Sequence, residues 1–269
     1  METNLEEIPT IGFGTWENTD PEQCAYSVKT AIDLGYRHID TAQFYDNERA
    51  VGRGIAESEV EREELFVATK VWFKNLTYDK VLSSTEESLE KLGLDYLDCL
   101  YIHWPAGPYD PDETLPAFEK LVEEKIVRNF AVSNFTVELI EEAADFLTIP
   151  IFANQVEMHP LHQQKEMREY LVENNMKLSA YSPFRHGTIF DNPTLNEIAD
   201  KHEVSVARIC LAWMRNLEGV YPIPKATGRE HIEDNFGARK LDLPPADREK
   251  INSLDRQDRY VDPPFAPWH

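Results

Sequence analysis

Four titratable residues of this 269-residue chain have the types and the spacing for acid–base chemistry: Asp40, Tyr45, Lys70 and His103. A lysine beside a tyrosine favours the tyrosinate and lowers the pKa of the phenol, and an aspartate keeps that lysine charged. The phenol can then give a proton to a developing alkoxide, while the histidine holds the carbonyl oxygen in place. Taken singly, the lysine and the histidine have ordinary interpretations, as a solvated strand-end residue and a core residue. Taken together, the four residues predict a catalytic group.

These four residues are far apart in the sequence, so the fold must bring them together. Short apolar runs alternate with longer segments of helical period, which indicates a parallel sheet with crossover helices. The apolar runs cover residues 11–15, 36–39, 65–71, 97–103, 126–133, 151–157, 177–181 and 220–224. The helical segments cover residues 21–34, 48–57, 78–92, 115–124, 137–147, 164–174, 194–202 and 206–217. Eight runs favour a closed barrel over an open sheet. We predict an α/β protein, a (β/α)8 TIM barrel that forms a single domain over residues 1–269.

Polar side chains stand at or beside the ends of eight successive runs: Thr15, Asp40, Lys70, His103, Ser133–Asn134, Gln155, Tyr181–Ser182 and Lys225. Barrel enzymes place their chemistry at the C-terminal ends of the strands. We expect two wider loops on the same face, at residues 105–114 and 184–192. The tail, residues 254–269, is rich in proline and aromatic residues. It either covers the barrel mouth or is a frayed end.

Several of these strand ends are suited to a cofactor. Ser133, Asn134 and Gln155 offer amide and hydroxyl groups to a carboxamide, Tyr181 offers a flat face to an aromatic ring, and Lys225 can meet a phosphate. The dinucleotide fingerprint of a doubly wound sheet is absent, because the GFG at 12–14 is followed by Thr and Trp with no third glycine. A nicotinamide cofactor is therefore expected to be held by barrel loops. We predict no metal site.

The chain resembles the aldo-keto reductase family, of the prokaryotic type. Motifs match in order and spacing along nearly the whole chain: GYRHIDTA (35–42) followed by Tyr45, Asn47, Glu48 and Gly52, then ATKVW (68–72), YIHWP (101–105), AVSNF (131–135), NQ (154–155), YSP (181–183) and IPK (223–225). The resemblance implies NAD(P)H-dependent reduction of aldehydes or ketones by direct hydride transfer. It implies a proton donor at Tyr45, a supporting ion pair of Asp40 and Lys70, and an orienting His103. It further implies a substrate pocket lined by Trp16, Trp72 and Trp104.

The expected phosphate clamp departs from the family pattern. Ala226 stands where a serine or threonine usually follows the lysine, and His231 stands where an arginine is usual. Histidine is mostly neutral at pH 7, so we expect NADPH as the cofactor with a reduced margin over NADH, whose use is possible. The remaining candidate cofactor-binding residues are Thr15, Trp16, Ser182, Pro183, Phe184, Thr227, Arg229, Asp234 and Asn235. A smaller departure is Ala131, where the family usually has glycine.

The charge of the chain limits its partners. It has 49 acidic and 27 basic residues and a formal net charge of −22, which repels nucleic acid and anionic membranes. The acids are spread over predicted helices, and we interpret them as the solvated surface of a halophile; an ordinary acidic enzyme is the alternative. No apolar run reaches the roughly 20 residues that span a bilayer, and the first residues do not resemble a signal peptide. The three cysteines are expected to be buried thiols in a reducing cytosol.

We therefore expect a cytoplasmic, monomeric oxidoreductase that acts on a small-molecule carbonyl compound. Two alternatives stay open. One is oxidation of a sugar or polyol as the physiological direction. The other is a barrel that binds the cofactor as a sensor or subunit, without turnover. The intact set of four candidate catalytic residues argues against this second alternative, because a protein that only binds the cofactor does not need the phenol.

Overall fold

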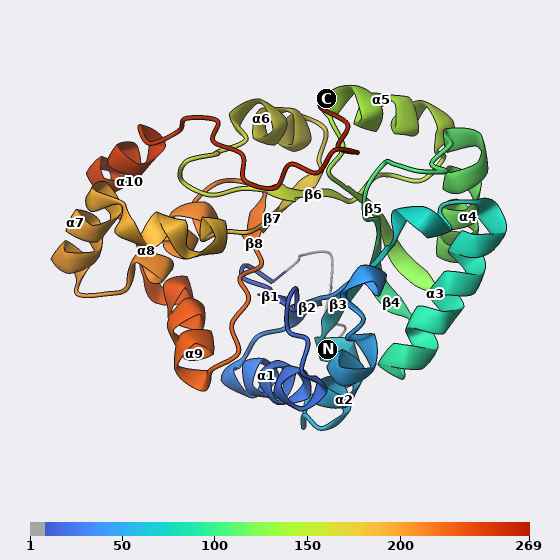
Figure 1. Cartoon of the computed structure of the whole chain (residues 1–269), viewed down its shortest axis with the longest axis horizontal. Helices are drawn as coiled ribbons and strands as arrows, with labels where there is room; N and C mark the ends of the chain where they lie inside the picture. The colour runs from blue at the N-terminus through green and yellow to red at the C-terminus, as the bar shows by residue number, and fades with distance from the viewer. Residues whose placement is uncertain (1–8) are drawn as a thin grey trace.

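Eight strands follow one another in sequence order around the centre of the computed structural model, which describes residues 9–269 (Figure 1). Each strand pairs in parallel with the next one along the chain. The strands are β1 (Phe13–Gly14), β2 (His38–Asp40), β3 (Phe66–Val71), β4 (Leu97–Ile102), β5 (Val127–Ser133), β6 (Ala153–Glu157), β7 (Lys177–Tyr181) and β8 (Val220–Pro222). Their order confirms the predicted parallel arrangement.

Two backbone hydrogen bonds join the first and last strands and close the sheet into a barrel. Gly12 N donates to Pro222 O at 2.9 Å, and Gly14 N donates to Pro224 O at 3.0 Å. The approach is so close that a Cβ atom on Gly14 would lie 2.8 Å from Ile223 O, so this seam requires a glycine. The predicted (β/α)8 barrel is thereby confirmed.

The helices lie around the outside of the strands (Figure 1). They are α1 (Pro21–Leu34), α2 (Glu48–Ala56), α3 (Tyr78–Leu92), α4 (Pro111–Glu123), α5 (Val137–Phe146), α6 (Lys165–Glu173), α7 (Pro193–His202), α8 (Val206–Arg215), α9 (Arg229–Gly237) and α10 (Pro245–Asn252). Local sequence signals determine both ends of α1. At its start, the Asp20 side chain accepts a hydrogen bond from Gln23 N at 2.8 Å and Pro21 occupies the first helical position. At its end, Gly35 terminates the helix with a φ of 107°. The predicted bounds of this helix are correct.

Two expectations about the helices were wrong. The loop expected at residues 105–114 is shorter, because Asp110 caps α4 and Pro111 occupies its first position, so the helix begins four residues before position 115. The helices α9 and α10 were not predicted at all. Both are short and largely polar, so they lack the apolar periodicity on which sequence reasoning depends.

Apolar side chains fill two regions of the barrel. The larger region lies between strands and helices and contains residues such as Val67, Leu100 and Val132. A smaller cluster consists of Phe66, Ala68, Cys99, Tyr101, Ala131 and Ala153. Neighbouring residues of one strand thus belong to different clusters, because successive strand side chains point to opposite faces. The three cysteines are buried and free. Within the described residues, no helix is both long and apolar enough to cross a membrane.

Candidate active site

The alternation of side chains along each strand brings the candidate residues into the barrel interior. Phe66 and Ala68 belong to the smaller of the two apolar clusters, on the face of β3 that points into the barrel. Lys70 is two residues further along the same strand. In the same way, His103 follows Cys99 and Tyr101 at intervals of two, just beyond β4. A period of two keeps each series on one face of its strand. The candidate residues therefore converge at the C-terminal end of the barrel.

Lys70 is the centre of this group. Its side chain is completely buried, and its Nζ atom donates hydrogen bonds to Asp40 Oδ1 at 2.5 Å, to Thr41 O at 2.8 Å and to Tyr45 OH at 3.3 Å. Burial is the largest single influence and on its own would lower the pKa of Lys70. The charges of Asp40 and Tyr45 and the hydrogen bonds to them together outweigh it, so the pKa is raised and the ammonium stays protonated. The predicted proximity of lysine, aspartate and tyrosine is thus present in the structure.

The expected effect of the lysine on Tyr45 is only partly present. Burial raises the pKa of Tyr45, and the charge of Lys70 lowers it by a smaller amount, so the net shift is upward. The prediction that the pKa of this phenol falls toward working pH was therefore wrong for this structure. Tyr45 is protonated at neutral pH, which is the state that a proton donor requires.

His103 is the fourth member of the group. Its ring lies 5.6 Å from the ring of Tyr45, centroid to centroid, in an edge-on arrangement. Burial, and then the charge of Lys70, hold the pKa of His103 well below its ordinary value. The imidazole is therefore neutral, and it faces the same cavity as Tyr45.

The amide residues of the predicted cofactor cradle form one hydrogen-bonded network. Asn134, held at a positive φ of 62°, donates from Nδ2 to His103 O and to Ser133 Oγ, both at 3.1 Å. Its Oδ1 accepts a hydrogen bond from Tyr181 OH at 2.8 Å, which fixes the Tyr181 ring. Gln155 donates from Nε2 to Asp40 Oδ2 at 2.8 Å. The cradle is thereby tied directly to the acid–base group, a link that the sequence did not predict.

A cavity of about 850 Å³ borders Asp40, Tyr45, His103 and the residues of the cradle. Its volume is in the upper part of the range found for ligand pockets. Most of the predicted site residues line it. Lys70 does not, but its Nζ atom lies 3.3 Å from the OH of Tyr45, which does. The predicted residues among its lining are Thr15, Trp16, Asp40, Tyr45, Trp72, His103, Trp104, Ser133, Asn134, Gln155, Tyr181, Ser182, Pro183, Phe184 and Lys225.

One wall of the cavity is aromatic and includes a residue that sequence reasoning missed. Phe44 stacks on Trp72 with a centroid distance of 4.0 Å and on Trp16 at 5.6 Å. It is 47% exposed although it contacts two tryptophans, and it lines the cavity. The sequence did contain one indication that Phe44 belongs to the site, because this residue directly precedes Tyr45.

The C-terminal tail supplies another wall of the cavity. Tyr260, Val261, Asp262, Pro263 and Phe265 line it, and Figure 1 shows the tail running from α10 across the barrel end in front of β6 and β5. The ring of Phe265 lies 5.4 Å from that of Trp104, centroid to centroid. Of the two alternatives for this tail, the structure supports the one in which it covers the mouth.

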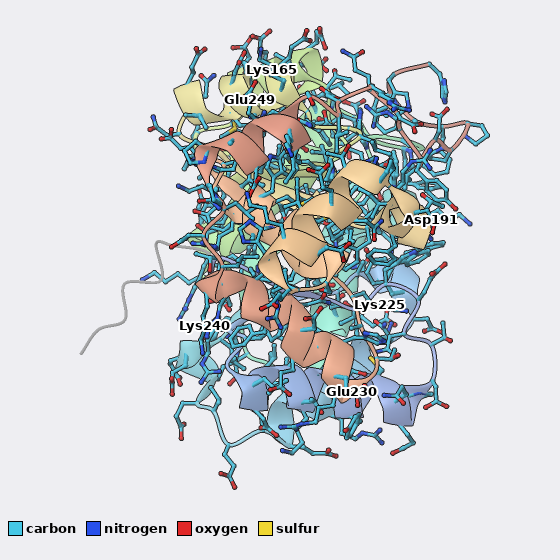
Figure 2. All side chains as sticks on the ribbon, turned by 90° about the vertical axis from the view of Figure 1, so that its left-hand side faces the viewer. Lys165, Asp191, Lys225, Glu230, Lys240 and Glu249 are labelled. Carbon is cyan, nitrogen blue, oxygen red and sulfur yellow. The ribbon has the colours of Figure 1, made fainter. Side chains whose placement is uncertain are left out.

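The predicted phosphate-binding residues are separated from the cavity, with one exception. Lys225 is exposed and lines it, whereas Thr227, Arg229, His231, Asp234 and Asn235 do not. Figure 2 shows Lys225 and Asp191 on one side of the barrel, Lys240 on the opposite side, and Glu230 at the end of α9 nearer to Lys225. Helix α9 therefore begins beside the cavity and leads away from it.

The carboxylate of Asp234 is bonded to two other side chains of the protein. Its Oδ1 lies 2.7 Å from Arg208 Nη2, and its Oδ2 accepts a hydrogen bond from Ser205 Oγ. Both partners belong to α8 or its N-cap. The side chain of the exposed His231, by contrast, has no hydrogen bond or ion pair with any residue the structure describes.

The donor set of the cavity fits a nicotinamide cofactor. Gln155 lines the cavity, and its Oε1 has no hydrogen-bond partner within residues 9–269, so it is free to accept from a carboxamide N–H. The ring of Tyr181, which its hydrogen bond to Asn134 fixes in place, and the exposed Lys225 line the same cavity. A metal has no comparable site, since the described part of the chain contains no cluster of three or more His, Cys, Asp or Glu residues suited to hold one.

Comparisons with known proteins agree with this geometry. The sequence model of the Aldo/keto reductase family matches residues 10–256. The chain is 42% identical over 259 residues to the 9,11-endoperoxide prostaglandin H2 reductase of Trypanosoma cruzi, which covers 95% of this chain and 91% of that protein. It is 42% identical over 256 residues to the glyoxal reductase of Bacillus subtilis, with 95% and 92% covered. The crystal structure of a Bombyx mori aldo-keto reductase in complex with NADP superposes with a TM-score of 0.89, at 32% identity over 97% of this chain and 94% of that one.

Proposed function

The chain belongs to the aldo/keto reductase family and is an NADPH-dependent oxidoreductase that reduces carbonyl groups; from this premise we propose that its substrates are small α-oxo aldehydes and that Tyr45 donates the proton. The observation that carries the assignment of Tyr45 is its place beside Lys70. The phenol oxygen lies 3.3 Å from a buried, charged ammonium that Asp40 holds at 2.5 Å.

Each member of the group has one task in this proposal. NADPH, when bound, supplies the hydride that reduces the carbonyl carbon. Tyr45 transfers its phenolic proton to the carbonyl oxygen as negative charge develops there. Lys70 stabilises the phenolate that remains, and Asp40 keeps Lys70 charged and in position. His103, neutral and lining the same cavity, holds the carbonyl oxygen by a hydrogen bond.

The nicotinamide end of the cofactor would be held by Ser133, Asn134, Gln155 and Tyr181. The free Oε1 of Gln155 and the fixed Tyr181 ring support this assignment. Thr15, Trp16, Ser182, Pro183, Phe184 and Lys225 border the remainder of the cavity and are proposed to continue the cofactor site. Trp16, Trp72 and Trp104 are proposed to line the substrate end.

The state of Tyr45 favours reduction as the direction of the reaction. Oxidation of an alcohol requires the phenolate as a base, and burial raises the pKa of this phenol. The choice of α-oxo aldehydes rests on the similarity to glyoxal reductase at 42% identity. An equally similar relative is named for a prostaglandin endoperoxide, so substrate choice is to be decided by experiment.

The test follows the loss of NADPH absorbance with four carbonyl compounds: glyoxal, methylglyoxal, an aldose and a ketose. We expect the highest kcat/KM with the two α-oxo aldehydes. A clearly higher value for the sugars would contradict the proposed substrate class. No NADPH consumption with any compound would contradict the proposed activity and favour a binding role.

A further inference from the structure

A single buried carboxylate holds the C-terminal tail at the point where the tail meets the cavity. Glu157 ends β6, and its side chain is 0% exposed. Its Oε1 accepts a hydrogen bond from Tyr260 N at 2.9 Å, and its Oε2 accepts one from Val261 N at 2.7 Å. The same Oε1 lies 2.9 Å from His159 Nε2. This carboxylate therefore joins the barrel to a segment more than a hundred residues away in the sequence.

The backbone of the tail has few other hydrogen bonds to the barrel in this stretch. Upstream, Leu161 O accepts hydrogen bonds from Arg256 N at 3.1 Å and from Asp258 N at 3.0 Å. From Arg259 to Phe265, the two bonds to Glu157 are the only backbone hydrogen bonds between the tail and the rest of the described chain. One side chain therefore makes all the hydrogen bonds that join the backbone of this stretch to the barrel, while the Tyr260 ring also stacks on His186 at 4.6 Å, centroid to centroid.

The same stretch forms the aromatic cover of the substrate end. The Phe265 ring lies 5.0 Å from the ring of Phe73 and 5.4 Å from that of Trp104, centroid to centroid. Trp104 and Phe73 line the cavity with it. A shift of residues 260–261 moves the start of the segment that carries this ring.

We propose that Glu157 is a positioning residue for the substrate: by holding Tyr260 and Val261, it keeps Phe265 over the cavity and thereby sets the KM for bulky carbonyl compounds. The proposal rests on the proposed function, because it concerns the affinity of the same site. Glu157 itself is not among the residues that line the cavity. It acts through the tail.

The chemistry of a carboxylate suits this role better than that of an amide. An ionised carboxylate only accepts hydrogen bonds, and here its two oxygens face three donors. A glutamine has one acceptor oxygen and a donor NH2 group in the place of the other. In Glu157→Gln at least one tail N–H therefore faces another donor inside a buried site, and such an unmade hydrogen bond is unfavourable.

The test compares methylglyoxal with phenylglyoxal, which carry the same reacting group and differ by an aromatic ring. Glu157→Gln and Phe265→Ala are each expected to raise the KM for phenylglyoxal by about tenfold, the equivalent of about 1.4 kcal/mol. The kcat values and the KM for methylglyoxal should change by less than about twofold. In the double variant the KM for phenylglyoxal should match that of Phe265→Ala alone, because Glu157 acts through this ring. Additive effects, or equal changes for both substrates, would overturn the proposal.

A second measurement does not depend on activity. Trypsin cleaves after Arg259, so we expect Glu157→Gln to lose residues 260–269 several times faster than the wild type does, as followed by mass spectrometry. The matched control is Glu48→Gln, at a buried glutamate that accepts a hydrogen bond from Thr69 Oγ1 at 2.7 Å, and its cleavage should be unchanged. Equal cleavage of Glu157→Gln and the wild type would overturn the proposal.

Val261→Pro provides the same test from the tail if Glu157→Gln does not fold. It removes one of the two tail donors without a change in the barrel, and the same selective rise in the KM for phenylglyoxal is expected. An unchanged KM in this variant would overturn the proposal. Failure of the wild type to reduce either compound would overturn the proposed function. Even in that case, faster cleavage of Glu157→Gln than of the wild type would support the conclusion that Glu157 positions the tail.

Discussion

Two opposing influences act on the phenol of Tyr45. Burial disfavours the negatively charged form and raises the pKa, whereas the Lys70 ammonium favours that form and lowers it. Because burial is the larger influence, the proton stays on the oxygen until a stronger base develops. In the proposed mechanism, an alkoxide that forms beside it is such a base. Lys70 would then contribute after the transfer, by stabilising the phenolate that has formed.

Tyr45→Phe tests the role of this proton. We expect kcat to fall on the order of 10²–10⁴-fold, the usual contribution of general acid catalysis. The Kd for NADPH, measured by quenching of tryptophan fluorescence, should change by less than about twofold. The control is Tyr26→Phe at a half-exposed tyrosine of α1, which should leave both values unchanged. Turnover close to the wild type in Tyr45→Phe would exclude this residue as the donor.

We expect discrimination between NADPH and NADH to depend on single residues as well. The extra phosphate of NADPH needs fixed cationic donors, and this chain has Ala226 and His231 where the family usually has a hydroxyl residue and an arginine. In the structure His231 is exposed and therefore free to turn toward a bound phosphate.

His231→Arg is expected to increase the ratio of kcat/KM with NADPH to that with NADH by about tenfold or more. The physical reason is one added charged hydrogen bond, worth roughly 1.5–3 kcal/mol. The measurement is steady-state kinetics with both cofactors, and Lys240→Arg, far from Lys225 in Figure 2, is the control. An unchanged ratio would show that residue 231 does not face the phosphate.

At the scale of elements, β2 carries a histidine that the proposed mechanism does not use. His38 is fully buried at the start of β2, and neither ring nitrogen has a hydrogen-bond partner in the described chain. Burial lowers the pKa of His38 to about 4. The unfolded chain therefore binds a proton more readily than the folded barrel does, and stability is lost as the pH falls from about 6.5 toward 4.

His38→Gln should remove this part of the acid sensitivity. We expect the free energy of unfolding of the wild type to fall about 2 kcal/mol further between pH 8 and pH 5 than that of the variant. Urea midpoints at the two pH values measure the difference, whatever the stability of the variant at pH 8. Parallel losses in the two proteins would show that His38 does not bind a proton on unfolding.

The start of α7 depends on one cap. Asn192 Oδ1 accepts hydrogen bonds from Thr194 N at 3.0 Å and from Leu195 N at 3.1 Å, and Pro193 occupies the first helical position. Asn192→Ala should lower the free energy of unfolding by about 1 kcal/mol and the Tm by about 2–4 °C. Asn192→Ser, which retains an acceptor, is the matched control and should keep most of the stability. Equal Tm values for the alanine and serine variants would contradict this role.

The whole molecule is dominated by negative charge. Nine exposed acids illustrate this surface. Those on α5 lie on a helix, as expected, whereas those near α2 follow its end instead of lying on it. They are Glu57, Glu59, Glu61, Glu63, Glu64, Glu138, Glu141, Glu142 and Asp145. Surface charges interact over about 10 Å in 0.1 M salt but over only about 3 Å in 1 M salt. Mutual repulsion should therefore destabilise this protein in dilute solution.

A salt titration tests the halophile interpretation, which stays a prediction. Because screening weakens the repulsion among the 49 acids, we expect the Tm to rise steadily between about 0.1 M and 2 M KCl. A series with an uncharged osmolyte separates screening from general exclusion effects. A Tm that is flat or falls across the KCl series would show that this surface is an ordinary acidic one.

The sequence by itself determined the barrel and predicted most of the candidate site, for a local reason. Strand residues alternate between two faces, and polar residues at the run ends mark the C-terminal mouth, so Asp40, Lys70 and His103 were identifiable from pattern alone. Only the tertiary structure decided three further features: the bond from Gln155 to Asp40, the place of Phe44 between Trp16 and Trp72, and the closure of the mouth by the tail. Each is a contact between segments that no periodicity relates. The pKa of Tyr45 belongs with them, because it depends on how deeply the fold buries the phenol.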